Sequence, residues 1–112
     1  MENMLAMKVQ AKFLPFKIYN IKPGKIYEVI GLDWKTYSII DEDNEPALYS
    51  KEYFNVIDST IPKEWIWKKF EDNTYVADPP EFSEPGFFER WHENEELARK
   101  IFDEYLIKNN LK

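Results

Sequence analysis

The residues that most often carry out catalysis are few in this chain and are not arranged for it. His92 is the only imidazole and the sequence has no cysteine, which argues against a Cys–His pair and against a zinc site of three or four Cys and His ligands. No serine stands in a nucleophile-elbow motif, and three glycines make no glycine-rich phosphate cradle. We therefore predict no catalytic residue, no metal ligand and no cofactor, and a protein that is not an enzyme.

Carboxylates are abundant and could in principle bind a cation or form an acid–base pair. The stretch DEDNEP at 41–46 begins like a calcium-binding loop, but it lacks the glycine that such a loop needs at its sixth position. Paired acids occur in any acidic chain, so they do not by themselves indicate a glycosidase. The acids are better candidates for a charged surface.

Length and composition favour a single folded unit. The chain has 112 residues, 44% of them hydrophobic and 17% aromatic, which is enough for one core and too much for disorder. The longest apolar runs fall far short of the roughly 20 residues that cross a bilayer. The start, MENMLAMKVQAKF, shows no apolar region behind a basic one, and cysteine is absent. We therefore expect a cytoplasmic protein without a membrane segment.

Charge is unevenly distributed along the chain, whose formal net charge is −6. Residues 1–40 hold six lysines against three acids, whereas residues 41–80 hold four lysines against ten acids. An acidic protein repels phosphate backbones at long range and attracts basic partners. Nucleic acid is thus an unlikely partner by charge, and a protein with a basic patch is the favoured one.

Aromatic side chains are the excess in the composition, and exposed rings make good anchors for a partner. Trp34 lies in a predicted loop and is the ring that we expect to be most exposed. On one continuous helix three glutamates near the C-terminus would form an acidic ridge, with a tryptophan close by but turned away. The candidate partner-binding residues are Trp34, Tyr49, Glu89, Trp91, Glu93 and Glu96.

The first half of the chain alternates apolar and polar residues in short runs separated by turn signals, which is typical of a β barrel or sandwich. The expected strands are 8–13, 25–30, 36–40, 47–49 and 53–57, with 31–35 and 41–44 as links. Within 25–30, we expect Tyr27 and Val29 on one face and Ile30 on the other. Five short strands can satisfy their edges by closing into a small barrel.

The segments KPGKIYEVI, YSIIDEDNEPALY and KEYFNVI resemble an uncharacterised family of small proteins and domains from low-GC Gram-positive bacteria and their phages. That family has a K-V-K-C-I start, a V-G-K-x-Y-E-V-I strand, a Y-x-I-I-D-D-x-G strand-turn and a closing K-E-Y-F-E-V. The resemblance covers residues 8–57 and implies a five-stranded Src-homology-3-like barrel. It speaks for fold more than function. Ala11 replaces the family's cysteine, and the 41–45 turn has no glycine, which implies a different hairpin loop.

After Pro62 the pattern changes to a hairpin and then to helix. EWIWKKF and TYVA, separated by EDN, predict a β-hairpin over 64–77, with Trp65 and Trp67 at its interface with a helix. Pro85 in a first turn and Asn94 as a cap predict two helices within 84–108. The expected apolar stripe of the second helix, which should pack on the hairpin or the barrel wall, is Leu97, Ala98, Ile101, Phe102, Tyr105 and Leu106.

These patterns predict a mostly β protein with a C-terminal α part. Residues 1–60 form the barrel, and residues 61–112 form the hairpin and the helices packed on it, in a single compact unit. The favoured function is a non-enzymatic protein-binding module, such as an immunity-type or phage-encoded inhibitor, that acts through an acidic surface. The alternative is a nucleic-acid-associated small barrel that uses the lysines of residues 8–35 with Phe16, Tyr19 and Trp34 as stacking rings.

Overall fold

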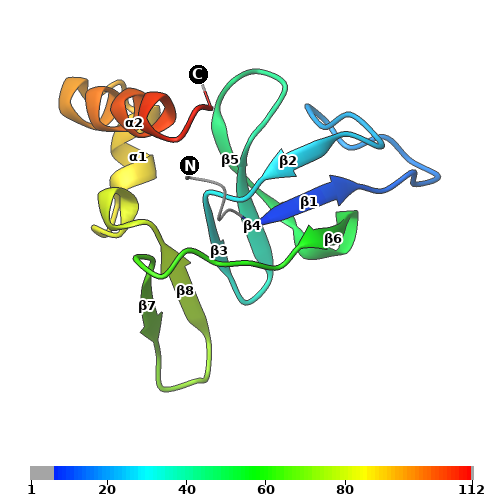
Figure 1. Ribbon diagram of the computed structural model, residues 1–112, viewed down its shortest axis with the longest axis horizontal. Coiled ribbons are helices and arrows are strands. Elements are labelled where there is room, and N and C mark those ends of the chain that lie inside the picture. Colours follow the sequence, from blue (N-terminus) through cyan, green and yellow to red (C-terminus); the bar gives the residue numbers. More distant parts are fainter. Residues whose placement is uncertain (1–6, 112) are drawn as a thin grey trace.

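The computed structural model describes residues 7–111, so the predicted boundaries at residues 1–6 and 112 lie outside the described part. The described chain is mostly β, with two antiparallel sheets and two helices near its end (Figure 1). The first sheet has the order β2-β1-β6, with β1 at Lys8–Ala11, β2 at Ile26–Glu28 and β6 at Phe54–Asp58. The second has the order β5-β4-β3-β8-β7, with β3 at Gly31–Asp33, β4 at Thr36–Ile40, β5 at Pro46–Ser50, β7 at Ile66–Lys69 and β8 at Tyr75–Asp78.

The chain passes from one sheet to the other between β2 and β3. Val29 and Ile30 lie in this crossing, with exposed fractions of 2% and 1%. Val29 packs in a first core cluster and Ile30 in a second, as their predicted opposite faces require. The prediction that 31–35 only links two strands is wrong, because Gly31 and Leu32 pair with β4 and Leu32 also pairs with Ala77 of β8.

The predicted closed barrel of five strands is not confirmed, because the described strands form two separate hydrogen-bonded sheets. Two predicted strands are also shorter than expected. The strand predicted over 8–13 is β1, which ends at Ala11, and the strand predicted over 25–30 is β2, which covers Ile26–Glu28. A 3₁₀ helix, η1, at Lys51–Tyr53 precedes β6, and Phe13, beyond the end of β1, is 84% exposed. The Phe13 ring lies over Gly24, whose φ of +84° and lack of a side chain allow this approach.

The predicted hairpin is confirmed as β7 and β8, but its role differs from the prediction. Trp65 is 5% exposed and belongs to the first core cluster, which lies between the sheets and not against the helices. Trp67 is 54% exposed and contacts Tyr75 at 5.8 Å between ring centroids. The expected Trp65–Trp67 interface with the helix is therefore wrong, since β8 joins the hairpin to β3 of the second sheet.

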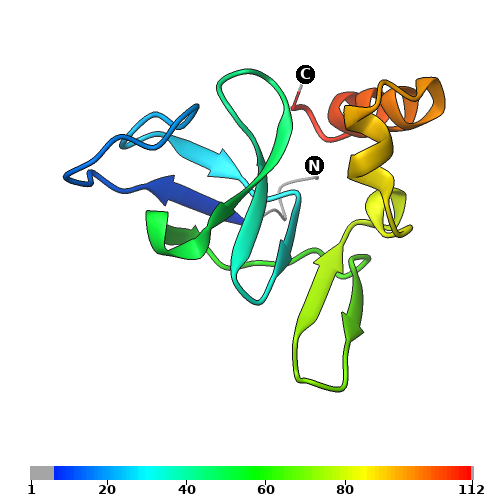
Figure 2. The same cartoon turned by 180° about the vertical axis from the view of Figure 1, so that it is seen from behind.

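The C-terminal part consists of a 3₁₀ helix, η2, at Pro80–Phe82, then α1 at Phe87–His92 and α2 at Glu96–Lys108. Pro85 precedes α1, whose N-cap is Gly86, and Asn94 interrupts the helix with a φ of +64° while Glu95 takes the N-cap of α2. Pro85 therefore lies before the first turn in which it was predicted, and Asn94 is not the predicted cap of the second helix, so both predictions are wrong. Figure 2 shows both helices together, on the side away from the β1–β2 loop.

The second core cluster holds these helices against the sheets. Its buried members are Ile30, Phe82, Phe87, Trp91, Ala98, Phe102 and Leu106. Ile40 of β4 packs at its border, so the stripe of α2 packs on η2, α1 and the sheet, without the hairpin tryptophans. Leu97, predicted in the same stripe, is 62% exposed.

Left-handed turns are made mainly by asparagine in this glycine-poor chain. All non-glycine residues of 7–111 with positive φ are asparagines: Asn20, Asn44, Asn73, Asn94 and Asn110. Asparagine tolerates this conformation better than other side chains. Asn44 supplies it in the 41–45 turn, which contains no glycine.

Candidate functional site: a groove between β5 and α1

A groove of about 570 Å³ lies between β5 and α1. Its apolar lining comes from Pro46, Ala47 and Leu48 of β5 and from Phe88 of α1. Leu48 is 61% exposed, which is unusual for a leucine in a strand beside a helix, and it offers an apolar contact to a ligand. The groove is thus apolar on its floor and open to a partner.

Local sequence determines which side chains of β5 and α1 face the groove. Leu48 pairs with Ser38 of β4, so these two side chains share one face of the sheet, whereas Ala47 and Tyr49 point to the other face. In α1 the buried residues Phe87 and Trp91 turn toward the second core cluster. The other face of the helix, which carries Phe88, Glu89, His92 and Glu93, therefore lines the groove together with Leu48 of β5.

Two carboxylates lie on the α1 rim of the groove. Glu89 and Glu93 line it together with His92, and both glutamates are exposed. The nearest arginine on the helix, Arg90, is already occupied, since it contacts Glu84 at 3.0 Å and Glu95 at 3.3 Å. Within residues 7–111, no lysine or arginine pairs with the two groove glutamates. They are therefore available to a basic group of a partner.

His92 ties the end of α1 to β5. Its Nε2 lies 3.0 Å from the carbonyl oxygen of Pro46, and because a carbonyl only accepts, this nitrogen donates the hydrogen. The ring also contacts Trp91 edge-on at 5.0 Å. The histidine thus lines the groove and connects its two sides through this hydrogen bond.

A second hollow of about 610 Å³ adjoins the first and shares Leu48, Phe88 and Glu89 with it. It continues toward β7 and β8, where Phe70, 50% exposed, and Asp78 line it. Burial raises the pKa of Asp78 from 3.8 to about 6, an effect that Lys68 opposes and Asp33 reinforces. The two hollows form a continuous concave surface along the second sheet.

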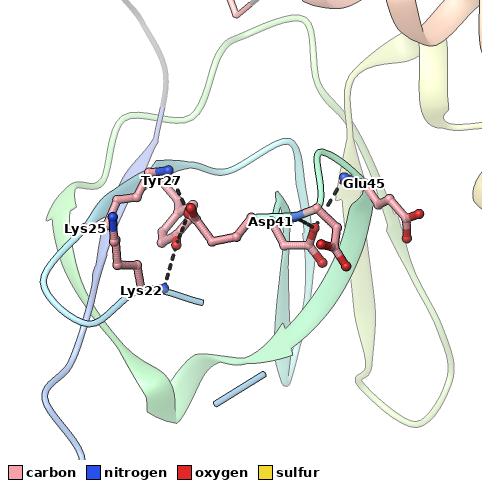
Figure 3. Close-up of polar contacts among 7 residues, drawn as sticks. Lys22, Lys25, Tyr27, Asp41 and Glu45 are labelled. Atoms are coloured by element: carbon pink, nitrogen blue, oxygen red, sulfur yellow. Dashed lines mark hydrogen bonds and ion pairs between the residues drawn. The ribbon is translucent and has the colours of Figure 1, made fainter. Parts of the chain in front are cut away.

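A separate cluster of polar side chains connects the β1–β2 loop with the β4–β5 loop (Figure 3). The Tyr27 hydroxyl donates to Glu42 at 2.7 Å and accepts from the backbone N–H of Lys22 at 2.8 Å, while Lys25 pairs with the same carboxylate oxygen at 2.7 Å. Burial raises the pKa of Tyr27 to about 12, and the Glu42 carboxylate adds to the shift. Tyr27 therefore stays protonated at neutral pH and acts as a hydrogen-bond donor, not as a base.

Asp41 organises the turn next to this cluster. Its carboxylate accepts from the backbone N–H of Asp43 at 2.9 Å, from that of Glu45 at 3.3 Å and from the Tyr49 hydroxyl at 2.9 Å. Burial and the Asp41 carboxylate raise the pKa of Tyr49 above its usual range. The acids of 41–45 thus hold a turn in place, and no three His, Cys, Asp or Glu residues of the described chain gather as a metal site.

The six candidate partner-binding residues do not form one site. Glu89 and Glu93 line the groove, whereas Glu96 is exposed in the first turn of α2 outside it. Trp91 is 6% exposed and is covered by Arg99 at 3.6 Å from the ring, so it cannot contact a partner directly.

The other two candidates lie in the β part of the chain, one in a turn and one in a strand. Trp34, in the β3–β4 turn, is 45% exposed, so the expectation that it is the most exposed ring is wrong: Phe13, Tyr19 and Trp67 are more exposed. Tyr49 is half-buried and its hydroxyl is bound to Asp41.

The sequence did not reveal the apolar lining of the groove. Leu48 and Phe88 each stand next to a residue that packs in or against a core cluster, Tyr49 and Phe87 respectively, so their apolar character alone does not separate them from core positions. The opposite parity of Leu48 with respect to Ala47 and Tyr49 was the available signal, because alternate strand residues face opposite sides.

Neither helix of residues 7–111 is long and apolar enough to pass through a bilayer. The chain matches no protein-family model, no curated protein sequence and no solved structure.

Proposed function

We propose that this protein is a non-enzymatic protein-binding module, and that its groove between β5 and α1 takes a partner segment with a large apolar side chain near a lysine or arginine. The observation that carries the proposal is the combination of the apolar Leu48 and Phe88 with two unpaired carboxylates on one rim. An apolar pocket with a few polar groups at its border is the usual form of a binding site.

The two parts of the groove have different tasks. Burial of apolar surface contributes about 25 cal/mol per Å², so an apolar anchor against Leu48 and Phe88 supplies most of the affinity. Exposed ion pairs contribute about 0–1 kcal/mol each, so Glu89 and Glu93 act chiefly on association rate and on the choice of partner. The net charge of −6 acts in the same direction over longer distances.

We also propose a biological role for the protein and a Src-homology-3-like arrangement of its first strands. An immunity-type or phage-encoded inhibitor in the cytoplasm would use such a groove to cover a basic patch of its target. A Src-homology-3-like arrangement for residues 8–57 is supported by β1, which pairs with both β2 and β6, and by the crossing between the sheets at Val29 and Ile30. That arrangement requires the sheet β2-β1-β6 and the strands β3, β4 and β5 to form one barrel.

The test is selection of peptides from a random display library on the full chain, followed by binding kinetics of the enriched peptides. We expect enriched sequences to combine a large apolar residue with lysine or arginine. The variant Glu89→Lys/Glu93→Lys should weaken binding about tenfold or more at low salt and less at high salt, with an unchanged melting temperature.

The matched control is Glu71→Lys/Glu104→Lys, which makes the same change in net charge at two exposed acids outside the groove. It should leave peptide binding almost unchanged. If no peptide is enriched, or if both double variants weaken binding equally, the groove is not a binding site for a basic segment.

One observation favours the nucleic-acid alternative. The β1–β2 loop exposes Phe13 at 84%, Phe16 at 57% and Tyr19 at 77%, beside the exposed Lys17 and Lys22. The acids of the neighbouring 41–45 turn argue against nucleic-acid binding, since Glu42 pairs with Lys25 of this loop and Asp43 accepts a hydrogen bond from Asn20. Salt-sensitive binding of a single-stranded pyrimidine oligonucleotide that is lost in Lys17→Glu would favour the alternative, and we expect no such binding.

A further inference from the structure

The outer edge of β5 is the second feature of the groove. In the β4–β5 ladder, the Asp41 N–H donates to the Glu45 carbonyl at 3.0 Å, and beyond its other end the Lys51 N–H donates to the Lys35 carbonyl at 2.9 Å. Hydrogen bonds of an antiparallel ladder involve alternate residues of each strand. Ala47 and Tyr49 therefore bond to β4, and the N–H and C=O of Leu48 face away from it.

The edge is short and closed at one end. Pro46 has no N–H, and its carbonyl already receives the hydrogen of His92. At the other end the chain leaves the strand into η1 directly after Ser50. Leu48 and Ser50 both direct their N–H and C=O to the open edge, and of these two residues only Leu48 lines the groove.

Side-chain alternation connects this edge with the groove. A residue that pairs with Leu48 across the free edge places its side chain on the same face as Leu48, the face that borders α1. Residues next to it point to the other face, and residues two positions away point again toward α1. A basic side chain two positions from the anchor therefore comes to the same side as Glu89 and Glu93.

We propose that the bound segment of the partner is extended and adds to β5 as a short antiparallel strand, exchanging two backbone hydrogen bonds with Leu48. Its apolar anchor lies opposite Leu48, and its lysine or arginine stands two residues from that anchor. This inference rests on the proposed function and adds the conformation of the ligand and the spacing of its two recognised side chains. All strand pairs of the described chain are antiparallel, and the added strand continues that arrangement.

The first experiment is an N-methyl scan of a peptide selected on the full chain. Methylation removes one backbone N–H at a time, so an added strand should show loss of binding at the anchor and near-normal binding at its two neighbours. We expect a loss of about three- to tenfold or more at the anchor, the effect of one lost hydrogen bond. The enriched sequences should also show the apolar and basic residues at a separation of two.

The second experiment acts on the protein. Leu48→Pro removes the outward N–H without removing a bond to β4, and Pro46 shows that proline fits this edge at a position of the same parity. Leu48→Ala is the matched control, because it shortens the side chain and keeps the N–H. We expect the proline variant to bind the peptide about three- to tenfold more weakly than the alanine variant.

Hydrogen exchange of the Leu48 amide in the unmodified protein gives a readout that does not depend on folding of the proline variant. Saturation with the peptide should slow this exchange clearly, while the exposed backbone around Glu71 stays unchanged. Binding that needs Glu89 and Glu93 but shows no alternation in the N-methyl scan and no slowing at Leu48 would overturn the added strand and leave the proposed function standing. Binding that is indifferent to the two glutamates would overturn the proposed function itself.

Discussion

Replacing Phe102 by alanine should destabilise the folded chain by about 3–5 kcal/mol. Phe102 is 2% exposed and lies at the centre of the second core cluster. Its ring centroid is 5.5 Å from that of Phe82, 5.6 Å from that of Trp91 and 6.4 Å from that of Phe88. The substitution therefore removes contacts between η2, α1 and α2 at once.

Three contributions make up this magnitude. Full burial of a phenylalanine side chain is worth about 1.5–3 kcal/mol, and aromatic pairs add about 0.5–1.5 kcal/mol each beyond their buried area. Alanine leaves a cavity that the neighbouring rings fill only in part, which adds to the cost. Stability of a small domain is about 5–15 kcal/mol in total, so the loss is a large share of it.

Urea unfolding followed by far-UV circular dichroism measures the effect. With a slope of about 1–3 kcal/mol per molar urea, a loss of 3 kcal/mol moves the midpoint down by about 1–3 M. The control is Leu97→Ala on the same helix, because Leu97 is 62% exposed and its truncation should cost within about 0.5 kcal/mol. One transition for all variants would support the predicted single compact unit.

Equal midpoints for Phe102→Ala and Leu97→Ala would refute the reasoning, because they would mean that α2 does not pack through its buried face. An early partial transition in Phe102→Ala alone would show instead that the helices unfold separately from the sheets.

Two further predictions concern the strand pair β3 and β8. The pKa of Asp78 is raised to about 6, so its ionised form is disfavoured in the folded chain; this penalty is absent below about pH 4 and complete above about pH 6. Asp78→Asn should therefore raise the melting temperature at pH 7 and leave it nearly unchanged at pH 4, and a pH-independent effect would contradict the burial of the carboxylate. Gly31→Ala would place a methyl group against the Asp78 carboxylate, at a cost of about 1–3 kcal/mol in urea unfolding. Adding Asp78→Ala should restore most of that loss, and no recovery would mean that the strain has another source.

The strand half of the fold was largely readable because it depends on local alternation. Tyr27, Val29 and Ile30 were placed on their faces from a period of two, and all three are buried in the structure, although Ile26, expected on the same face as Ile30, is 49% exposed. What could not be read was the pairing of distant segments. Gly31–Asp33 resembles a loop because it is short and begins with glycine, and only its pairing with β4 and β8 makes it a strand.

The candidate site was found in part for a similar reason. Glu89 and Glu93 were recognised from charge and spacing, and the structure places both at the groove. Trp91 was chosen because tryptophan often anchors partners, but its face of α1 is the one that packs inward. The apolar side of the groove depends on how α1 stands against β5, which is a tertiary arrangement that no local pattern in the sequence encodes.

The position of β3 between β4 and β8 has a consequence for synthesis of the chain on the ribosome. A hairpin such as β3–β4 forms in about 1–10 µs, but β8 ends 45 residues after β3. At about 5–20 residues per second, the nascent chain carries β3 with one bare edge for about 2–9 s before its second neighbour is made. During that interval the edge can pair with another nascent chain. Because Asp33 ends β3 and Gly31 begins it, this edge is short and ends in a charge, both of which limit such mispairing.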